Sequence, residues 1–495
     1  MVTPAPTPRP AGAAVTVPRG VRVGYGVGSV CTATFSTVPG LLLLFYMTNV
    51  LAVPAWIAGA VAFLPKLWDM VINPWVGQRS DRTVSRLGPR RPWMLLGAVT
   101  LPVTFALTFA GPPLTGLPAA LYVTVCYFLT ATAYAFYEVP YKAMATEMTD
   151  DYHERSSLLQ WKMVFLGLAI LLSGAGAPAL AGTEVTGYRL MGLVIGAVLL
   201  VSMLASVTGT ARAPLAGRAE AEPSLRAQFA AARSSRPFLV LLALSCAQMF
   251  AAGTLLAGAP YFATYVLDAP GATTTLFLCV VGPLLVTMPL WMWLSRRYDK
   301  RGAMVLSAAL FTAGTAAMAL SDRFGTGYAH ACVLVVGVGY AGFQLLQFSM
   351  LSDVVVHDTA VTGRRRAGVF TGLWTACETV VFALGALVLG WLLGATGFVE
   401  SSASEAVAQP DSAIAAALYG GALIPALAAG VSVLLTLRYP ITAETMRAVD
   451  AAGVADAADA AGAAGVSEAS EAGDGAGEEP GVTARAGDEP EPAGA

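Results

Sequence analysis

The chain has 495 residues, of which 56% are hydrophobic and 12% are charged. Soluble domains carry about 25% charged residues, so this composition excludes an ordinary soluble protein and indicates a chain that crosses a membrane several times. The formal net charge of −2 combines a basic membrane body with an acidic stretch from residue 441 onward. We expect no nucleic-acid partner for such a chain.

Twelve apolar stretches are long enough to cross a bilayer as helices, which takes about 17 to 25 residues each. The sequence therefore predicts an all-α membrane protein with twelve transmembrane helices. These stretches lie near residues 22–48, 55–77, 93–111, 118–145, 161–181, 189–208, 238–266, 273–294, 303–320, 327–350, 367–395 and 413–437.

Lysine and arginine in short loops favour the cytoplasmic side of a membrane. The loops after the second, sixth, eighth and tenth helices are rich in arginine, whereas those after the first, third, seventh and eleventh contain no lysine or arginine. We therefore expect a multi-pass protein of the cytoplasmic (plasma) membrane with both termini in the cytoplasm. The expected parts are a disordered N-terminus (1–21), a six-helix bundle (22–208), a cytoplasmic linker (209–236), a second six-helix bundle (237–439) and an acidic disordered tail (440–495).

The second apolar stretch contains three polar residues, Lys66, Asp69 and Asn73, which are spaced to share one helical face. A charge near the bilayer centre costs about 2.5 to 3.5 kcal/mol on insertion scales, so such residues face other helices or a water-filled cavity. One interpretation is that Asp69 has a coupling role in a cavity. The other is that Lys66 and Asp69 only neutralise each other within the bundle.

The stretch from Lys66 to Gly77, followed by Asp81-Arg82-Thr83 and by Gly88-Pro89-Arg90-Arg91-Pro92, resembles a signature of the glycoside-pentoside-hexuronide:cation symporters. This melibiose-carrier family belongs to the major facilitator superfamily. The resemblance implies two pseudo-symmetric six-helix bundles and a secondary active transporter that moves a glycoside, sugar or hexuronide by alternating access. It also implies a cation site at Asp69, Asn73 and Glu138, with Asn73 in place of the second aspartate of the family.

The loss of that carboxylate favours H⁺ over Na⁺ as the coupling ion, because a lone acid in a low dielectric can take up a proton near neutral pH. An amide oxygen can still ligate Na⁺, so both ions are retained as hypotheses. We expect no other cofactor and no bound metal, because the cysteines and histidines are scattered without metal-ligand spacing.

Polar residues on other helices are candidates for substrate binding. Glu138-Val139-Pro140-Tyr141 matches a family pattern whose acid binds sugar and cation, and Trp374 would offer a stacking surface. The alternatives are a Glu138–Lys142 pair within one helix and ordinary bundle packing for Trp374. The predicted substrate-binding residues are Tyr134, Glu138, Lys142, Lys162, Gln344, Gln347, Trp374, Glu378 and Thr379.

Two acids, Glu147 and Asp353, end the fourth and tenth helices close to arginine-rich loops. We interpret Arg82, Glu147, Arg297 and Asp353 as gating residues that pair when the cytoplasmic side is closed. Placement of these long side chains at the membrane interface is the alternative.

The sequence has no phosphate-binding loop and no nucleophile motif, so we expect neither an ATP-driven pump nor an enzyme. The predicted protein is a monomer in a lipid bilayer with a small-molecule substrate. The alternatives are an exporter of a drug-like or secondary metabolite, a lysolipid carrier and, last, a non-transporting receptor.

Overall fold

The computed structural model describes residues 17–149, 152–213, 233–363, 366–402 and 407–448. In these ranges twelve helices are long and apolar enough to cross a membrane, which confirms the predicted all-α architecture. The helices are α1 (Arg19–Asn49), α2 (Ala55–Asp81), α3 (Arg91–Phe109), α4 (Gly116–Glu147), α5 (Tyr152–Ala181), α6 (Val185–Gly209), α8 (Arg236–Tyr261) with the π-helix η1 (Phe262–Val266), α9 (Ala272–Tyr298), α10 (Lys300–Met318), α11 (Ser321–Thr362), α12 (Ala367–Ala395) and α13 (Asp411–Leu437).

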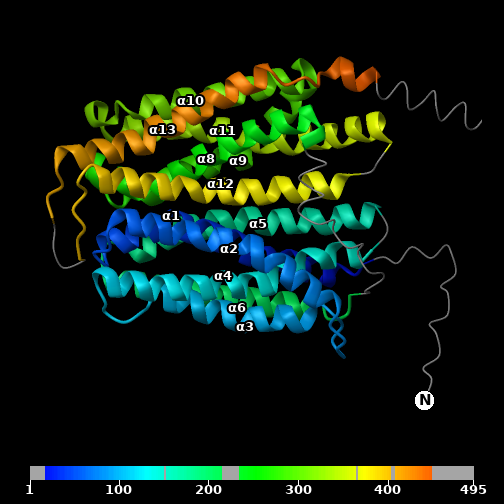
Figure 1. Ribbon diagram of the computed structural model, residues 1–495, viewed down its shortest axis with the longest axis horizontal. Coiled ribbons are helices and arrows are strands. Elements are labelled where there is room, and N and C mark those ends of the chain that lie inside the picture. The colour runs from blue at the N-terminus through cyan, green and yellow to red at the C-terminus, as the bar shows by residue number, and fades with distance from the viewer. Residues whose placement is uncertain (1–16, 150–151, 214–232, 364–365, 403–406, 449–495) are drawn as a thin grey trace, which may run out of the picture.

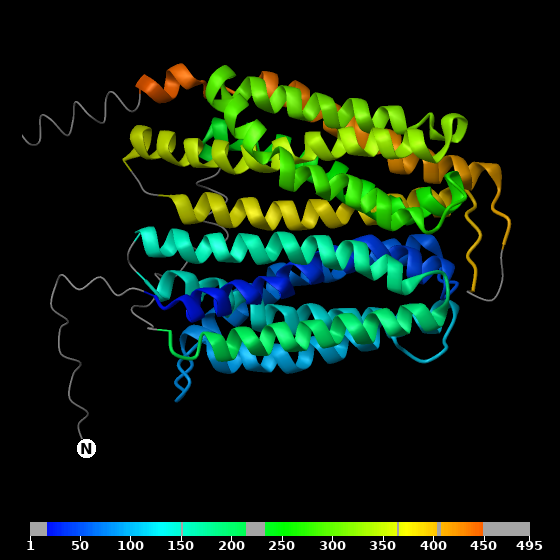
Figure 2. The same cartoon turned by 180° about the vertical axis from the view of Figure 1, so that it is seen from behind.

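The helices form two bundles, α1–α6 and α8–α13, which lie side by side (Figures 1 and 2). One large apolar core includes Phe105 and Tyr188 of the first half and continues into the second half through residues such as Leu389. A second core, which includes Phe311 and Phe343, lies within the second half. Helix α1 begins and helix α13 ends at the same end of the molecule (Figure 1), which we call the terminal end. The other end, where α1 meets α2, is the opposite end.

Helices α2 and α12 make the closest crossing between the halves, at two glycines. A Cβ on Gly59 would lie 3.1 Å from the carbonyl oxygens of Ala386 and Leu387, and a Cβ on Gly390 would lie 2.6 Å from the carbonyl oxygen of Ala55. A Cβ at Gly390 would force the neighbouring backbone to shift, and a Cβ at Gly59 would make a tight contact, so the crossing favours glycine at both positions.

The described hydrogen bonds between the halves lie at or near the opposite end. The Thr48 and Tyr261 hydroxyls are 2.6 Å apart, and Tyr265 of η1 donates to Asn49. Main-chain bonds join the same region, because Ser401 N–H donates to Thr48 O at 3.1 Å and Ala52 N–H donates to Ser401 O at 3.2 Å. No described hydrogen bond or ion pair joins the halves at the terminal end. Within the part of the chain that the structure describes, the hydrogen bonds between the halves therefore lie at the opposite end.

Some expected boundaries differ from the structure. Helix α1 begins at Arg19, within the expected disordered N-terminus, and residues 443–448 of the expected disordered tail form a short helix. Thr442 starts this short helix, because its carbonyl oxygen and its hydroxyl accept bonds from Met446 N–H and Thr445 N–H. The expected disorder of 1–16, of most of the linker (214–232) and of 449–495 falls outside the described residues.

Candidate functional site

A cavity of about 400 Å³ lies between the two halves. Its walls are largely apolar, and they include Phe262, Phe277, Phe311 and Phe382. The polar residues that line it come from both halves: Ser36, Thr37, Lys66 and Tyr127 from the first, and Tyr340, Gln344, Glu378 and Thr379 from the second. A mostly apolar cavity with a few convergent polar groups is typical of a binding site for a small molecule.

The predicted Lys66–Asp69 pair forms on α2. Lys66 Nζ lies 3.6 Å from Asp69 Oδ2 and 4.3 Å from the centre of the Phe35 ring on α1. Asp69 is buried, and its second oxygen, Oδ1, has no hydrogen-bond partner among the described residues. Asn73 is half-buried one turn further along. A carboxylate with one free oxygen in a buried site is able to accept a proton or ligate a cation.

Glu138 lies at the centre of a second cluster, between α1, α4 and α5. Its Oε2 accepts a hydrogen bond of 2.7 Å from the Thr32 hydroxyl, and its Oε1 lies 3.1 Å from Lys142 Nζ. The charge of Lys162 also acts on Glu138, and its ammonium lies 5.5 Å from the centre of the Tyr141 ring. Glu138 is only 3% exposed, so this carboxylate depends on its neighbours rather than on bulk water.

Tyr134 belongs to the same region, since its ring stacks on Phe35 with the ring centres 4.2 Å apart. The structure therefore brings Tyr134, Glu138, Lys142 and Lys162 together with the Lys66–Asp69 pair. Thr32 was missed by the sequence argument, which named no residue of the first helix as a candidate. Its signal was a hydroxyl residue on a helix that faces a buried acid.

The second half contributes the remaining polar residues of the cavity wall. Tyr340 accepts a hydrogen bond of 3.0 Å from Gln344, and both residues line the cavity. Glu378 and Thr379 also line it, and Glu378 Oε1 accepts a bond of 3.0 Å from the Ser245 hydroxyl.

Six of the nine predicted binding residues are not among those that line the cavity: Tyr134, Glu138, Lys142 and Lys162, which belong to the cluster around Glu138, and Gln347 and Trp374, which are buried in the second half. Gln347 is fully buried and donates to Gln248 of α8, which in turn donates to Ser432 of α13 at 3.2 Å. Trp374 is also fully buried in the core of the second half. In this conformation both side chains hold helices together, so Trp374 corresponds to the packing alternative rather than to a stacking surface for a sugar.

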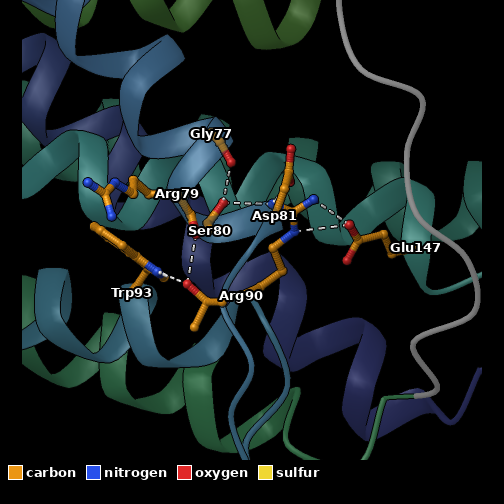
Figure 3. A network of polar contacts seen from close by, with 8 residues as sticks. Gly77, Arg79, Ser80, Asp81, Arg90, Trp93 and Glu147 are labelled. Atoms are coloured by element: carbon orange, nitrogen blue, oxygen red, sulfur yellow. Dashed lines mark hydrogen bonds and ion pairs between the residues drawn. The ribbon is translucent and has the colours of Figure 1, made fainter.

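Arg90 organises the terminal end of the first half (Figure 3). Its guanidinium donates to Glu147 Oε1 through Nη2 at 2.6 Å and Nε at 2.9 Å, donates to Ser80 through Nη1 at 2.7 Å, and pairs with Asp81. Burial alone would lower the pKa of Arg90, but the bonds and charges of Glu147 and Asp81 outweigh burial and raise that pKa. The guanidinium therefore stays charged and ties the ends of α2 and α4 to the start of α3.

The pairing partners expected for the gate differ from those observed. Glu147 pairs with Arg90 rather than with Arg82, which is exposed. In the second half Asp353 pairs with Lys300 at 2.7 Å, whereas Arg297 is exposed and lies over the Tyr298 ring. The physical reason is position: Arg90 directly precedes α3, Lys300 is the first residue of α10, and both pair within their own half. A gating role for Arg82 and Arg297 stays a prediction for the state in which the terminal end is closed.

Two six-helix bundles around a shared cavity define a membrane transporter of the alternating-access class. A family model described as MFS/sugar transport protein matches residues 24–443, so the chain belongs to that family. This confirms the family and the class of protein that the sequence predicted. The protein is a multi-pass secondary transporter for a small molecule and not an enzyme.

Known proteins resemble the chain over most of its length. A putative glycoside/cation symporter of Escherichia coli, YagG, is 26% identical, with 86% of this chain and 93% of the relative covered. The glucuronide carrier protein homolog of Escherichia coli is 23% identical, covering 77% and 84%. A solved structure of a bacterial homolog of the human lysosomal transporter Spinster, inward-facing and unoccupied, matches with a TM-score of 0.63 at 13% identity, covering 85% of this chain and 95% of that one.

Proposed function

We propose that the protein is a proton-coupled carrier of a small anionic glycoside, of which a hexuronide is the simplest example. The observation that supports this proposal is the charge of one cluster in the first half. There the three lysines Lys66, Lys142 and Lys162 surround the two carboxylates Asp69 and Glu138. With both carboxylates ionised the cluster has a net charge of about +1, which favours a substrate that has one negative charge. The name of the glucuronide carrier homolog supports the same class of solute.

The hydroxyl groups of such a substrate need hydrogen-bonding partners in the second half. Tyr340 and Gln344 line the cavity and supply a hydroxyl and an amide, and Thr379 supplies a further hydroxyl. In this arrangement the acid group of the solute lies beyond the cavity wall, in the Glu138 cluster near Lys142 and Lys162, and its sugar ring lies in the cavity between the halves. Binding at both sides is what allows a solute to bias the closure of two bundles.

The coupling ion is assigned to Asp69, with Glu138 beside it. Asp69 is buried with one oxygen free, and Asn73 supplies no second negative charge next to it. A single carboxylate suits H⁺, because a proton needs one acceptor, whereas a hard metal cation prefers several oxygens. Neutralisation of Asp69 also raises the positive charge of the site and strengthens its attraction for an anion.

We assign the terminal end to the cytoplasm, because arginine is concentrated in the loops there. In this assignment the described conformation is closed to the outside and faces inward. The Spinster homolog to which the fold is similar was also solved facing inward. Labelling of the loop between α8 and α9 by an impermeant reagent in intact cells, without labelling of the loop after α2, supports this orientation, and the reverse pattern refutes it.

The apolar walls favour a second candidate, an amphipathic solute such as a lysolipid or a drug-like compound that is exported. Four phenylalanines and many aliphatic residues line the cavity, and a hydrophilic sugar leaves much of that surface uncovered. A carrier with this substrate would bind through the apolar wall of the second half rather than through the lysines.

A ligand-stabilisation screen of the purified carrier separates the two candidates. We expect a hexuronide such as methyl glucuronide to raise the melting temperature, and the matched neutral methyl glucoside to raise it less. Lys162→Gln should remove most of the uronide effect and little of the glucoside effect. If neither sugar stabilises the protein while a lysolipid does, and Lys162→Gln leaves that shift intact, the glycoside assignment is refuted.

Proteoliposomes test the coupling ion. Uptake of the stabilising solute should follow an imposed pH gradient at fixed membrane potential. Accumulation driven by a Na⁺ gradient, without a response to pH, would refute proton coupling while leaving the substrate class untouched.

A further inference from the structure

Two charged residues of opposite sign face the cavity, one from each half. Among the described residues that line it, Lys66 of α2 and Glu378 of α12 are the only ones with a charge. Neither contacts the other in this conformation. Lys66 pairs with Asp69 on its own helix, and Glu378 accepts a hydrogen bond from Ser245 in its own half.

The helix register places these two residues at the same depth in the molecule. Gly59 of α2 packs on Ala386 of α12, and the two helices run in opposite directions. Two turns from Gly59 toward the terminal end is Lys66, and two turns from Ala386 toward the same end is Thr379, next to Glu378. Seven residues complete about two turns of helix, so Lys66 and Thr379 keep the faces on which the glycine crossing occurs.

The present partner of Lys66 is weakly held. Its ammonium is 3.6 Å from one Asp69 oxygen, which is long for a charge-assisted hydrogen bond, and the other Asp69 oxygen has no partner among the described residues. Glu378 has the Ser245 hydroxyl as its hydrogen-bond donor but no cation within ion-pair distance among the described residues. A buried charge without a counter-charge is unstable, so Lys66 needs a second partner whenever Asp69 is neutralised.

We propose that Lys66 exchanges partners during transport, pairing with Asp69 while the terminal end is open and with Glu378 when that end closes. Neutralisation of Asp69 by the coupling ion frees the ammonium, and the new pair across α2 and α12 draws the two halves together. The proton stays on the Asp69 carboxyl and Lys66 keeps its own charge throughout, so only the pairing changes. The inference rests on the proposed coupling role of Asp69, and it adds Glu378 as the residue that converts ion binding into closure.

The other ionisable groups around both acids are one amine, several phenols and two thiols. Near Asp69 they are Lys142, Tyr127 and Tyr134, and near Glu378 they are Tyr340, Cys246 and Cys377. None of the groups near Glu378 is a cation. Lys66 is therefore the amine that the α2–α12 register brings toward Glu378.

The test measures the conformation directly and needs no substrate. Spin labels are attached to cysteines introduced at Arg86 and Arg296, which are exposed at the terminal end of the two halves, in a chain whose six native cysteines are replaced. Double electron–electron resonance in liposomes then gives the populations of the open and closed terminal end. Asp69→Asn imitates the neutralised acid, and we expect it to raise the closed-to-open ratio about tenfold, a shift within the usual range for a two-state carrier.

The same shift should require both partners of the new pair. Glu378→Gln or Lys66→Gln, each added to Asp69→Asn, should return the ratio to within about twofold of the parent, as expected for residues that are energetically coupled. Thr375→Val is the matched control, because Thr375 lies on α12 outside the cavity lining, and it should leave the shift intact. Asp69→Glu is the control for substitution at position 69 itself. It keeps the negative charge and should leave the closed-to-open ratio unchanged.

Two results would overturn the inference. One is a shift on Asp69→Asn that persists fully without Glu378. The other is an unchanged closed population in Asp69→Asn. Neither result depends on the substrate assigned above, and Asn imitates Asp69 neutralised by H⁺ or by Na⁺. Failure of the uronide screen or of the pH-driven uptake is therefore distinguishable from failure of the partner exchange.

Discussion

The Arg90 cluster allows a quantitative prediction about the stability of the first half. The Arg90 and Glu147 side chains are both only 5% exposed, and Arg90→Ala leaves the Glu147 carboxylate buried without its partner. Breaking a buried pair from one side costs about 3 to 5 kcal/mol. For a unit of about 200 residues, at about 2 to 4 °C per kcal/mol, this corresponds to a fall in melting temperature of roughly 6 to 20 °C.

The second half contains a matched control. Lys300 and Asp353 occupy the equivalent place, but their side chains are 37% and 19% exposed. A pair so open to solvent contributes about 1 kcal/mol or less, so Lys300→Ala should lower the melting temperature by only a few degrees.

Buried cysteines provide the assay. Cys31 lies in the first half and Cys332 in the second, and both are buried. Single-cysteine versions that keep one or the other react with a fluorogenic maleimide only when that half unfolds. Arg90→Ala should lower the temperature at which Cys31 reacts much more than the temperature at which Cys332 reacts. An equal fall in melting temperature for Arg90→Ala and Lys300→Ala would show that burial does not set the strength of these pairs.

Three further outcomes are expected. Tyr261→Phe removes the hydrogen bond to Thr48, and such a bond contributes about 1 kcal/mol. Labelling of a cysteine introduced near the opposite end should therefore rise about fivefold, and unchanged labelling would show that this bond does not help to close that end. Thr32→Ala removes the hydroxyl that donates to Glu138 and should weaken uronide binding about tenfold, as expected for loss of a hydrogen bond to a charged group. Thr32→Ser keeps the hydroxyl and should keep the affinity, so equal loss of affinity in both variants would contradict the role of the hydroxyl. Deletion after Asp450 should leave uptake in proteoliposomes intact, because that segment has almost no large apolar residue to pack; normal insertion without uptake would refute this.

The sequence predicted what depends on local pattern. Hydropathy located the twelve membrane-crossing helices, because each depends only on its own length and apolar content. Spacing on one helix also predicted two contacts that form, Lys66 with Asp69 at i, i+3 and Glu138 with Lys142 at i, i+4. Both contacts were given as alternatives to a functional role, in which a lysine neutralises the acid on its own helix.

Contacts between helices were beyond the same reasoning. Tyr340, Gln344 and Gln347 share one helical face, yet only the first two line the cavity, because Gln248 of α8 covers that face at the level of Gln347. Nothing in the local sequence reports how far α8 extends along α11. The partner of Glu147 was unpredictable for the same reason. Glu147 pairs with Arg90 and not with Arg82 because of the path of the loop after α2, which local sequence does not determine.

The glycine crossing between α2 and α12 also provides a means of trapping one conformation. A bulky side chain at Gly59 or Gly390 would act as a wedge and push the two helices apart, because the nearest carbonyl oxygens lie 3.1 Å from a Cβ at Gly59 and 2.6 Å from a Cβ at Gly390. Because the halves are fastened at this end, such a wedge would penalise the inward-facing conformer and leave the outward-facing one accessible. A tryptophan substitution at either glycine would thus make the missing half of the transport cycle available for structure determination and for raising conformation-specific antibodies.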